Sequence, residues 1–126
     1  MVENVYPAVL ESDALLVLCP NYNDALSANV MAFINRLTSL TVNNLLQGKQ
    51  LFSIVVSGYS GGDLVAQQLL GALCLNKAFT LPPRCCMLET ANDPDTAMHL
   101  PGIGDRLQRF AGGIVSALRQ GMPTAR

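Results

Sequence analysis

The sequence has few charged residues. Only 13% of its 126 residues are charged, against about 25% in an average soluble domain. Eight Lys and Arg are opposed by nine Asp and Glu, giving a net charge of −1, and the basic residues are scattered. We therefore expect no nucleic-acid partner, because no basic footprint for a phosphate polymer is present. The 50% hydrophobic content predicts that part of the surface is covered by something else.

Long apolar runs are also missing. The longest, such as Ala14 to Cys19, are about six residues, whereas a helix that crosses a bilayer needs roughly 20. The first residues, Met-Val-Glu-Asn-Val-Tyr-Pro, lack the basic and then apolar stretches of a secretion signal. We therefore expect a cytoplasmic protein that does not associate with a membrane.

Metal-ligand spacing is absent as well. Four cysteines, Cys19, Cys74, Cys85 and Cys86, follow no zinc pattern, and the chain has one histidine, so we expect no metal site. The adjacent Cys85 and Cys86 are awkward to bridge to each other. Their apolar strand context favours buried thiols, and a redox switch is the alternative interpretation.

The chain does contain alternating strand and helix patterns. Its length predicts a single domain over residues 1–126. Continuous apolar runs predict strands over 14–19, 51–56 and 84–88, and apolar residues at intervals of three and four predict helices over 26–40, 63–75 and 105–118. Tyr6 and Pro7 resemble the end of an earlier helix, residues 90–104 are expected to form a loop, and residues 122–126 a frayed tail. Strands joined through helices predict right-handed crossovers and a parallel α/β sheet.

The first predicted strand has the sequence of an interior strand. It contains no charge, no proline within its apolar run and no polar face. Its free edge should therefore be paired, either by another copy of the chain in a homo-oligomer or by a missing N-terminal half upstream of Met1.

Two loops follow the first two predicted strands. They read Pro20-Asn21-Tyr22-Asn23-Asp24 and Ser57-Gly58-Tyr59-Ser60-Gly61-Gly62. Ligands of open parallel sheets bind at the carboxyl ends of the strands. Each loop combines a tyrosine, hydrogen-bonding side chains and backbone amides before a helix, which suits a planar ring with carbonyl groups, such as a flavin. In the alternative interpretation the polar residues only turn and cap the chain, and the glycines only allow positive φ.

Residues 20–36, which read PNYNDALSANVMAFINR, resemble without a gap the segment after the third strand of the flavodoxin-like NAD(P)H-dependent flavin and quinone reductases. Gly48-Lys49 and the Ser57 to Gly62 loop are similar to that family's next strand–helix unit. The resemblance spans about Glu11 to Leu75. It implies a flavodoxin-like three-layer α/β/α sheet, FMN at the strand ends, NAD(P)H as co-substrate and a homodimer.

The resemblance also assigns site residues. It implies that Pro20, Asn21, Tyr22 and Asn23 flank the isoalloxazine ring. It further implies that backbone amides address the pyrimidine edge of the ring from Ser57, Gly58, Tyr59, Ser60, Gly61 and Gly62. No side chain is required as a general acid or base, because the flavin N5 takes part in the hydride transfer.

The sequence departs from the family pattern in two places. The family has lysine and aspartate four residues apart in the helix after the first loop, where this chain has Met31 and Asn35. The family's first strand and its Ser/Thr-rich phosphate loop precede the region that matches, so only the ring-binding half is visible. A truncated chain, one piece of a split protein, and a non-catalytic flavodoxin-like assembly protein all remain open.

A serine hydrolase is a further alternative. Residues 58–62 satisfy G-x-S-x-G between a strand and a helix, with Ser60 as the candidate nucleophile. Asp93, Asp95 and His99 follow in the chain order of a triad. An acid four or six residues before its histidine leaves little chain in which to place both around one serine, so the reductase is favoured.

Overall fold

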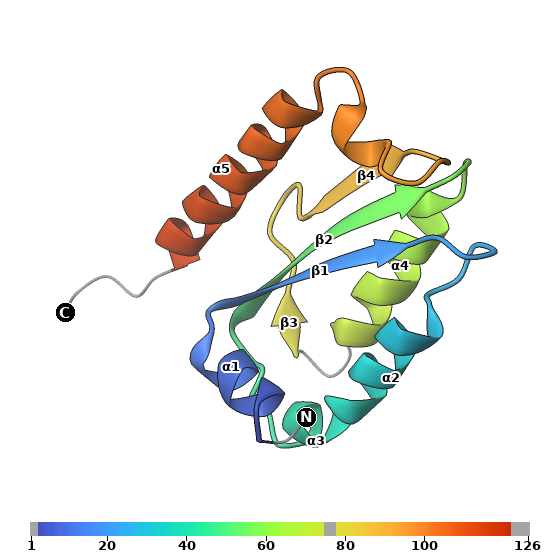
Figure 1. Ribbon diagram of the computed structural model, residues 1–126. Helices are drawn as coiled ribbons and strands as arrows, with labels where there is room; N and C mark the ends of the chain where they lie inside the picture. Colours follow the sequence, from blue (N-terminus) through green and yellow to red (C-terminus); the bar gives the residue numbers. More distant parts are fainter. Residues whose placement is uncertain (1–2, 75–77, 122–126) are drawn as a thin grey trace.

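The computed structural model describes residues 3–74 and 78–121. Its helices and strands alternate along the chain (Figure 1). In order they are α1 (Val5–Glu11), β1 (Ala14–Pro20), α2 (Ala28–Arg36), α3 (Thr38–Val42), β2 (Lys49–Ser57), α4 (Gly62–Leu73), β3 (Phe79–Thr80), β4 (Cys86–Thr90), the 3₁₀ helix η2 (Ala97–His99) and α5 (Ile103–Gly121).

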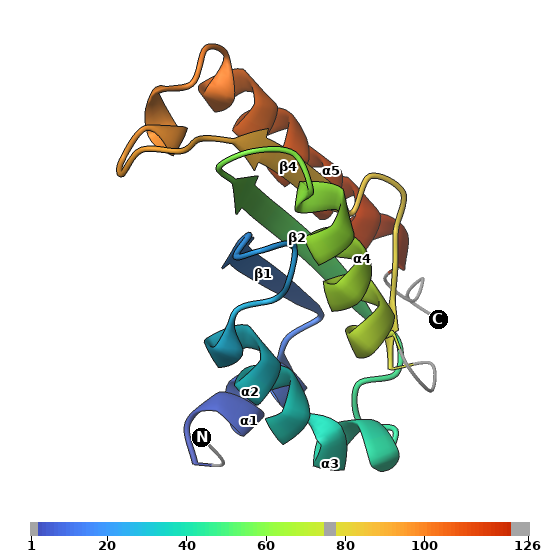
Figure 2. The same ribbon diagram turned by 90° about the vertical axis from the view of Figure 1, so that its right-hand side faces the viewer.

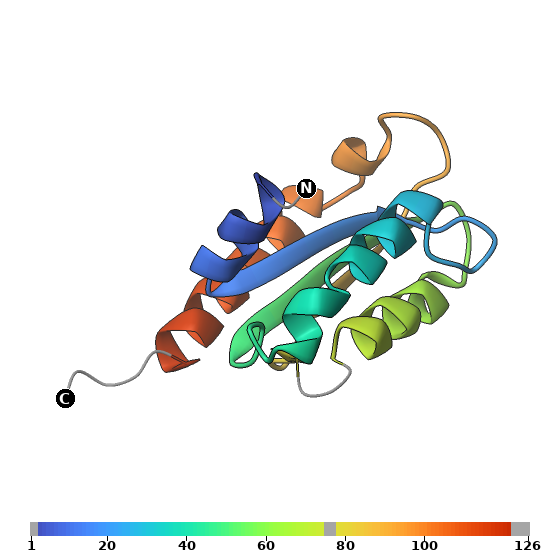
Figure 3. The ribbon, with the colours of Figure 1, turned by 90° about the horizontal axis from the view of Figure 1, so that it is seen from below.

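The sheet is parallel throughout and is centred on β2. One side of β2 pairs with β1, with Leu18 opposite Ile54. The other side pairs first with β3 and then with β4, where Met87 lies opposite Ile54. The helices α2 and α4 lie over one face of this sheet and α5 over the other (Figure 3). The predicted α/β class and its layered flavodoxin-like arrangement are confirmed.

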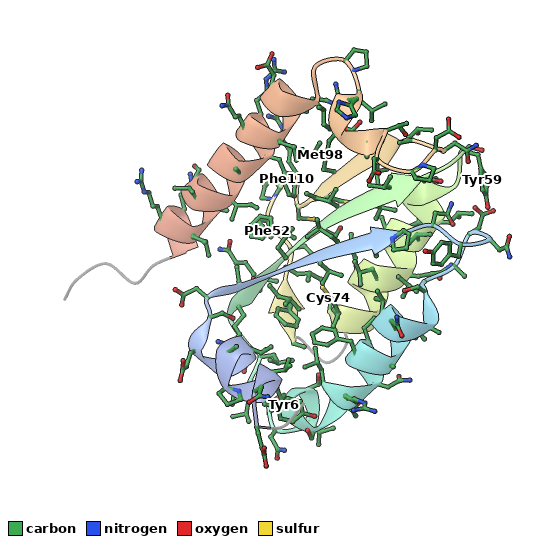
Figure 4. All side chains as sticks on the ribbon, viewed as in Figure 1. Tyr6, Phe52, Tyr59, Cys74, Met98 and Phe110 are labelled. Atoms are coloured by element: carbon green, nitrogen blue, oxygen red, sulfur yellow. The ribbon has the colours of Figure 1, made fainter. Side chains whose placement is uncertain are left out.

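Residues of β2 alternate between the two faces, as the two-residue period of a strand requires. Leu51 and Val55 are fully buried in the core cluster shared with Val65 and Leu69 of α4. Phe52 points to the other face, where its ring meets Phe110 of α5 edge-on at a centroid distance of 6.3 Å (Figure 4). The central strand therefore holds both helical layers in place.

Two predicted elements have different bounds in the structure. The helix expected over 26–40 is divided into α2 and α3 at Leu37, where the Thr38 hydroxyl donates to the Asn35 carbonyl at 2.7 Å. Such local bonds compete with the helical pattern. Ser27 caps α2 by accepting from the Val30 amide at 3.3 Å.

The third predicted strand begins late. It was expected from residue 84 but starts at Cys86, because Arg84 has a φ of 56° after two prolines and cannot join the ladder. The short β3 was not predicted, Thr90 belongs to β4 rather than to the following loop, and α5 begins at Ile103 and continues to Gly121. Leu75, the expected end of the helix before β3, and the expected tail 122–126 lie outside the described residues.

The outer edge of β1 is unpaired within residues 3–74 and 78–121. Figure 2 shows β1 at one side of the sheet, next to β2. Val17 and Cys19 are buried, whereas Leu16 and Leu18, on the opposite face, are 43% and 65% exposed. This strand is apolar on both faces, and one of those faces is open. None of the helices in the described part of the chain is long and apolar enough to span a bilayer.

Candidate functional site

The loop after β1 ends in a tight turn. The backbone N–H of Ala25 donates to the carbonyl of Tyr22 at 3.2 Å, and the reverse bond measures 3.5 Å. Asn23 and Asp24 between them have φ values of 54° and 57°, the left-handed pair typical of a type I′ turn, where Asn and Asp are favoured. The turn leaves the Tyr22 ring 63% exposed at the carboxyl end of the sheet.

Asn21 joins this turn to the loop after β2. Its side-chain amide donates to the Ser57 hydroxyl at 2.9 Å and to Asp24 Oδ1 at 3.2 Å. Its oxygen accepts from the Asp24 backbone N–H at 2.8 Å. Asn21 and Ser57 are both buried, so these bonds form in surroundings where an unpaired polar group is costly. The side chain predicted to flank a ring therefore also positions both loops.

The glycine-rich loop packs directly against the turn. Gly61 has a φ of 104°, and a Cβ at this position would lie 2.0 Å from Asp24 Oδ1. Behind it, Gln68 of α4 donates to the Asp24 carbonyl at 2.8 Å and accepts from the Leu26 N–H at 3.2 Å. The second loop and the helix after it thus fix the position of the first loop.

A third loop contributes a residue that the sequence analysis missed. The Ala91 N–H donates to the Ser57 carbonyl at 2.9 Å. A Cβ on Gly58 would lie 2.6 Å from Asn92 Oδ1, so the glycine at residue 58 leaves room for the Asn92 side chain. Ligands of parallel sheets bind at the carboxyl ends of strands, and this rule could also have identified Asn92. It was missed because the third strand was predicted to end at residue 88, whereas β4 ends at Thr90.

These three loops enclose a cavity of about 320 Å³. It is lined by Pro20, Asn21, Tyr22, Val56, Gly58, Tyr59, Ala91 and Asn92. A neighbouring cavity of about 250 Å³ is lined by Ser57, Tyr59, Ser60, Gly61, Gly62, Asp63, Leu88, Glu89 and Thr90. Tyr59 borders both and lies at the end of β2 (Figure 4). The structure therefore brings Tyr22 and Gly58 to one crevice. Asn23 lies exposed at the turn.

The hydrolase arrangement is not assembled. Ser60 is exposed, and no hydrogen bond among the described residues joins its hydroxyl to His99, Asp93 or Asp95. The Thr96 side chain instead donates to the Asp93 backbone carbonyl at 2.7 Å. A nucleophile needs a base within hydrogen-bonding reach.

The cysteines are all free thiols. Burial raises the pKa of the Cys19, Cys74 and Cys85 thiols above their usual range, and neighbouring cysteines add to the effect. A raised pKa keeps a thiol protonated at neutral pH and slows its oxidation. Cys19 is buried and the other three cysteines are partly buried, and the raised pKa of Cys85 favours a structural thiol over a redox switch at that position.

The family model for NADPH-dependent FMN reductase matches residues 1–93. The chain belongs to this family. The match ends at the loop that carries Asn92, so it includes all three strand ends that line the cavity. As a member of the FMN reductase family, the chain is a flavin-binding, NAD(P)H-dependent oxidoreductase whose cofactors are FMN and NAD(P)H. The resemblance seen in the sequence is confirmed.

Solved structures agree on the fold of this FMN reductase family member. A flavodoxin, WrbA-like protein from Agrobacterium tumefaciens has a TM-score of 0.71 at 16% identity, over 95% of this chain and 74% of its own. The flavodiiron protein from Giardia intestinalis has a TM-score of 0.61 at 16% identity, over 91% of this chain and 26% of its own. RosB, solved with bound 8-demethyl-8-formylriboflavin-5'-phosphate, has a TM-score of 0.60 at 14% identity, over 97% of this chain and 61% of its own. No curated protein matches the sequence.

The residues at the cavity fit a flavin ring. Tyr22 and Tyr59 provide exposed aromatic faces, and Gly58 leaves backbone uncovered between them. Asn92 adds an amide side chain from the third loop. The residues that line this cavity come from the ends of β1, β2 and β4 and from the loops that follow them.

Proposed function

We propose that the loops after β1, β2 and β4 hold the isoalloxazine ring of FMN. The reaction at this site would be the NAD(P)H-dependent reduction of a flavin or a quinone. The observation that carries the proposal is the single cavity bordered by Tyr22, Gly58, Tyr59 and Asn92. It lies at the carboxyl end of a parallel sheet, where this class of fold binds its ligands.

Each part of the site has a separate role in this proposal. Tyr22 and Tyr59 contact the faces of the ring and exclude water from it. Backbone amides from Ser57 to Gly62 donate to the carbonyls of its pyrimidine edge, and the buried pair Asn21 and Ser57 keeps the two loops at a fixed separation. FMN, when bound, supplies the hydride and electron transfer. No side chain of the chain is required as a general acid or base.

The proposal predicts that each tyrosine contributes to flavin affinity. Tyr22→Ala and Tyr59→Ala should each raise the Kd for FMN about tenfold, because an aromatic contact with its buried area is worth roughly 1–2 kcal/mol. The measurement is quenching of flavin fluorescence on titration. Val42→Ala in α3 is the matched control, since this side chain is 67% exposed and far from the strand ends. An unchanged Kd in both tyrosine variants would contradict the assignment.

We further propose that a second copy of the chain pairs with the free edge of β1. Antiparallel pairing about Val17 would place Leu16 opposite the partner's Leu18, so that four leucines share one face. The exposure of Leu16 and Leu18 and the absence of charge on β1 support this homodimer.

The dimer has a direct test. Leu18→Lys should convert a dimer into a monomer, because a charged side chain on an edge strand resists pairing. Light scattering after gel filtration measures the mass. Leu64→Lys is the control, since Leu64 is 44% exposed but lies on α4. A wild-type chain that stays monomeric at high concentration would exclude this interface.

A cytoplasmic location completes the proposal. The four free thiols support it, because reducing compartments keep cysteines unpaired. Fractionation of cells that express the chain from its own promoter would test the location.

A further inference from the structure

A third cavity lies between β4 and α5, away from the two cavities at the strand ends. Its volume is about 340 Å³, and its lining residues are Arg84, Cys86, Met87, Arg106, Arg109, Phe110 and Gly113. None of these residues lines the cavities at the strand ends. Met87 pairs with Ile54, three residues before the Ser57–Thr90 pair that ends the ladder, which corresponds to about 10 Å along the sheet.

One side of this cavity is built by a single face of α5. Arg106, Arg109, Phe110 and Gly113 recur at intervals of three and four, the spacing that brings side chains onto one side of a helix. Phe110 is fixed from behind by its edge-on contact with Phe52. Met87, 8% exposed, contributes from the strand. The apolar part of the cavity is thus held by the core.

The three arginines differ in their partners. Arg106 makes a two-pronged ion pair with Glu89, at 2.7 and 2.8 Å, and donates to the Pro101 carbonyl at 2.7 Å. Its charge is therefore balanced and its position fixed. Arg84 and Arg109 have no acidic partner within the described residues. Two uncompensated guanidinium groups therefore border an apolar cavity.

Space in this cavity depends on Gly113. A Cβ added there would meet nothing within 4 Å, and the same holds for Gly112, which does not line the cavity. Glycine lowers helix stability by about 1 kcal/mol relative to alanine, so neither glycine helps α5 to form. At position 113 the missing side chain leaves the cavity open.

We propose that this cavity binds a small organic anion, a carboxylate or phosphate group on an apolar or aromatic body. Guanidinium groups bind both kinds of oxyanion through paired hydrogen bonds. The anionic group would lie between Arg84 and Arg109, and the body would contact Met87 and Phe110. The site is separate from the flavin site and does not depend on the function proposed above.

The experiment uses anilinonaphthalene sulfonate, a fluorescent aromatic anion, with the full chain saturated with FMN so that the flavin site is filled. Saturable binding is expected. The variant Arg84→Gln/Arg109→Gln should weaken it about tenfold or more, since hydrogen bonds to charged groups contribute roughly 1.5–3 kcal/mol. Gly113→Leu should abolish it by filling the cavity, whereas Gly112→Leu, an equal change one residue away, should leave it unchanged.

Competitors identify the anionic group. Displacement of the probe by phenyl phosphate but not by benzoate would indicate a phosphate ligand. Displacement by benzoate but not by phenyl phosphate would indicate a carboxylate ligand. Benzyl alcohol, which has no charge, should not displace the probe. A neutral probe, phenylnaphthylamine, reports binding to apolar surface alone. The proposal is overturned if Gly113→Leu and Gly112→Leu bind the sulfonate equally, or if the double arginine variant binds it as tightly as the wild type.

Discussion

Gly61→Ala is expected to cost about 3 kcal/mol of unfolding free energy and to remove measurable FMN binding. A side chain at a φ of 104° is strained by roughly 1–3 kcal/mol. The new Cβ would also lie 2.0 Å from Asp24 Oδ1, and Asp24 cannot simply withdraw because Asn21 holds it through two hydrogen bonds. The turn that carries Tyr22 would have to move. Urea denaturation and an FMN titration measure the two effects.

Gly48 offers a matched comparison. It has a φ of 87°, but a Cβ there meets nothing within 4 Å, so Gly48→Ala isolates the backbone strain. We expect a loss of about 1 kcal/mol with unchanged FMN affinity. Combining Gly61→Ala with Asp24→Gly should recover part of the lost stability, because the clashing carboxylate is gone. Equal losses in Gly61→Ala and Gly48→Ala would show that the loops do not press on each other.

Asn21→Leu is expected to destabilise the protein by about 2–4 kcal/mol and to weaken FMN binding more than tenfold. The change removes the donor to the buried Ser57 hydroxyl, which keeps the 3.4 Å bond from the Tyr59 N–H, and it removes the acceptor of the part-buried Asp24 N–H. Each group that loses such a partner costs roughly 1–3 kcal/mol. The two loops would also lose the link that sets their separation. Thermal unfolding and flavin fluorescence provide the measurements.

A double-mutant cycle separates this link from a general packing defect. Ser57→Ala removes the other partner of the 2.9 Å bond, so the double variant Asn21→Leu/Ser57→Ala should lose less than the sum of the single changes. Interaction energies of about 0.5–3 kcal/mol are typical of residues in contact. Strict additivity would mean that the bond does not join the loops.

The sequence was sufficient for features that depend on local pattern. The strands predicted over 14–19 and 51–56 are short, mostly apolar runs bounded by Pro20 and Gly48, and the structure has β1 and β2 at these places. Tyr22 and Gly58 could be predicted to share a crevice because loops after neighbouring parallel strands emerge at the same end of a sheet.

Features that depend on contacts between distant residues could not be predicted. Gly61 is required to be glycine partly by Asp24, and Arg106 is held by Glu89, 17 residues earlier. The spacing of residues along α5 does not reveal this ion pair, because the acidic partner on β4 is identified only once the strand and the helix are packed together. Arg84 also delays β4 through a backbone conformation that its residue type does not reveal.

The two hydrogen bonds of Gln68 have a mechanical consequence. Its one amide group bonds the chain on both sides of Ala25, at the Asp24 carbonyl and the Leu26 N–H. A shift of α4 along its axis would therefore move the loop that carries Tyr22 directly, without a movement of the sheet.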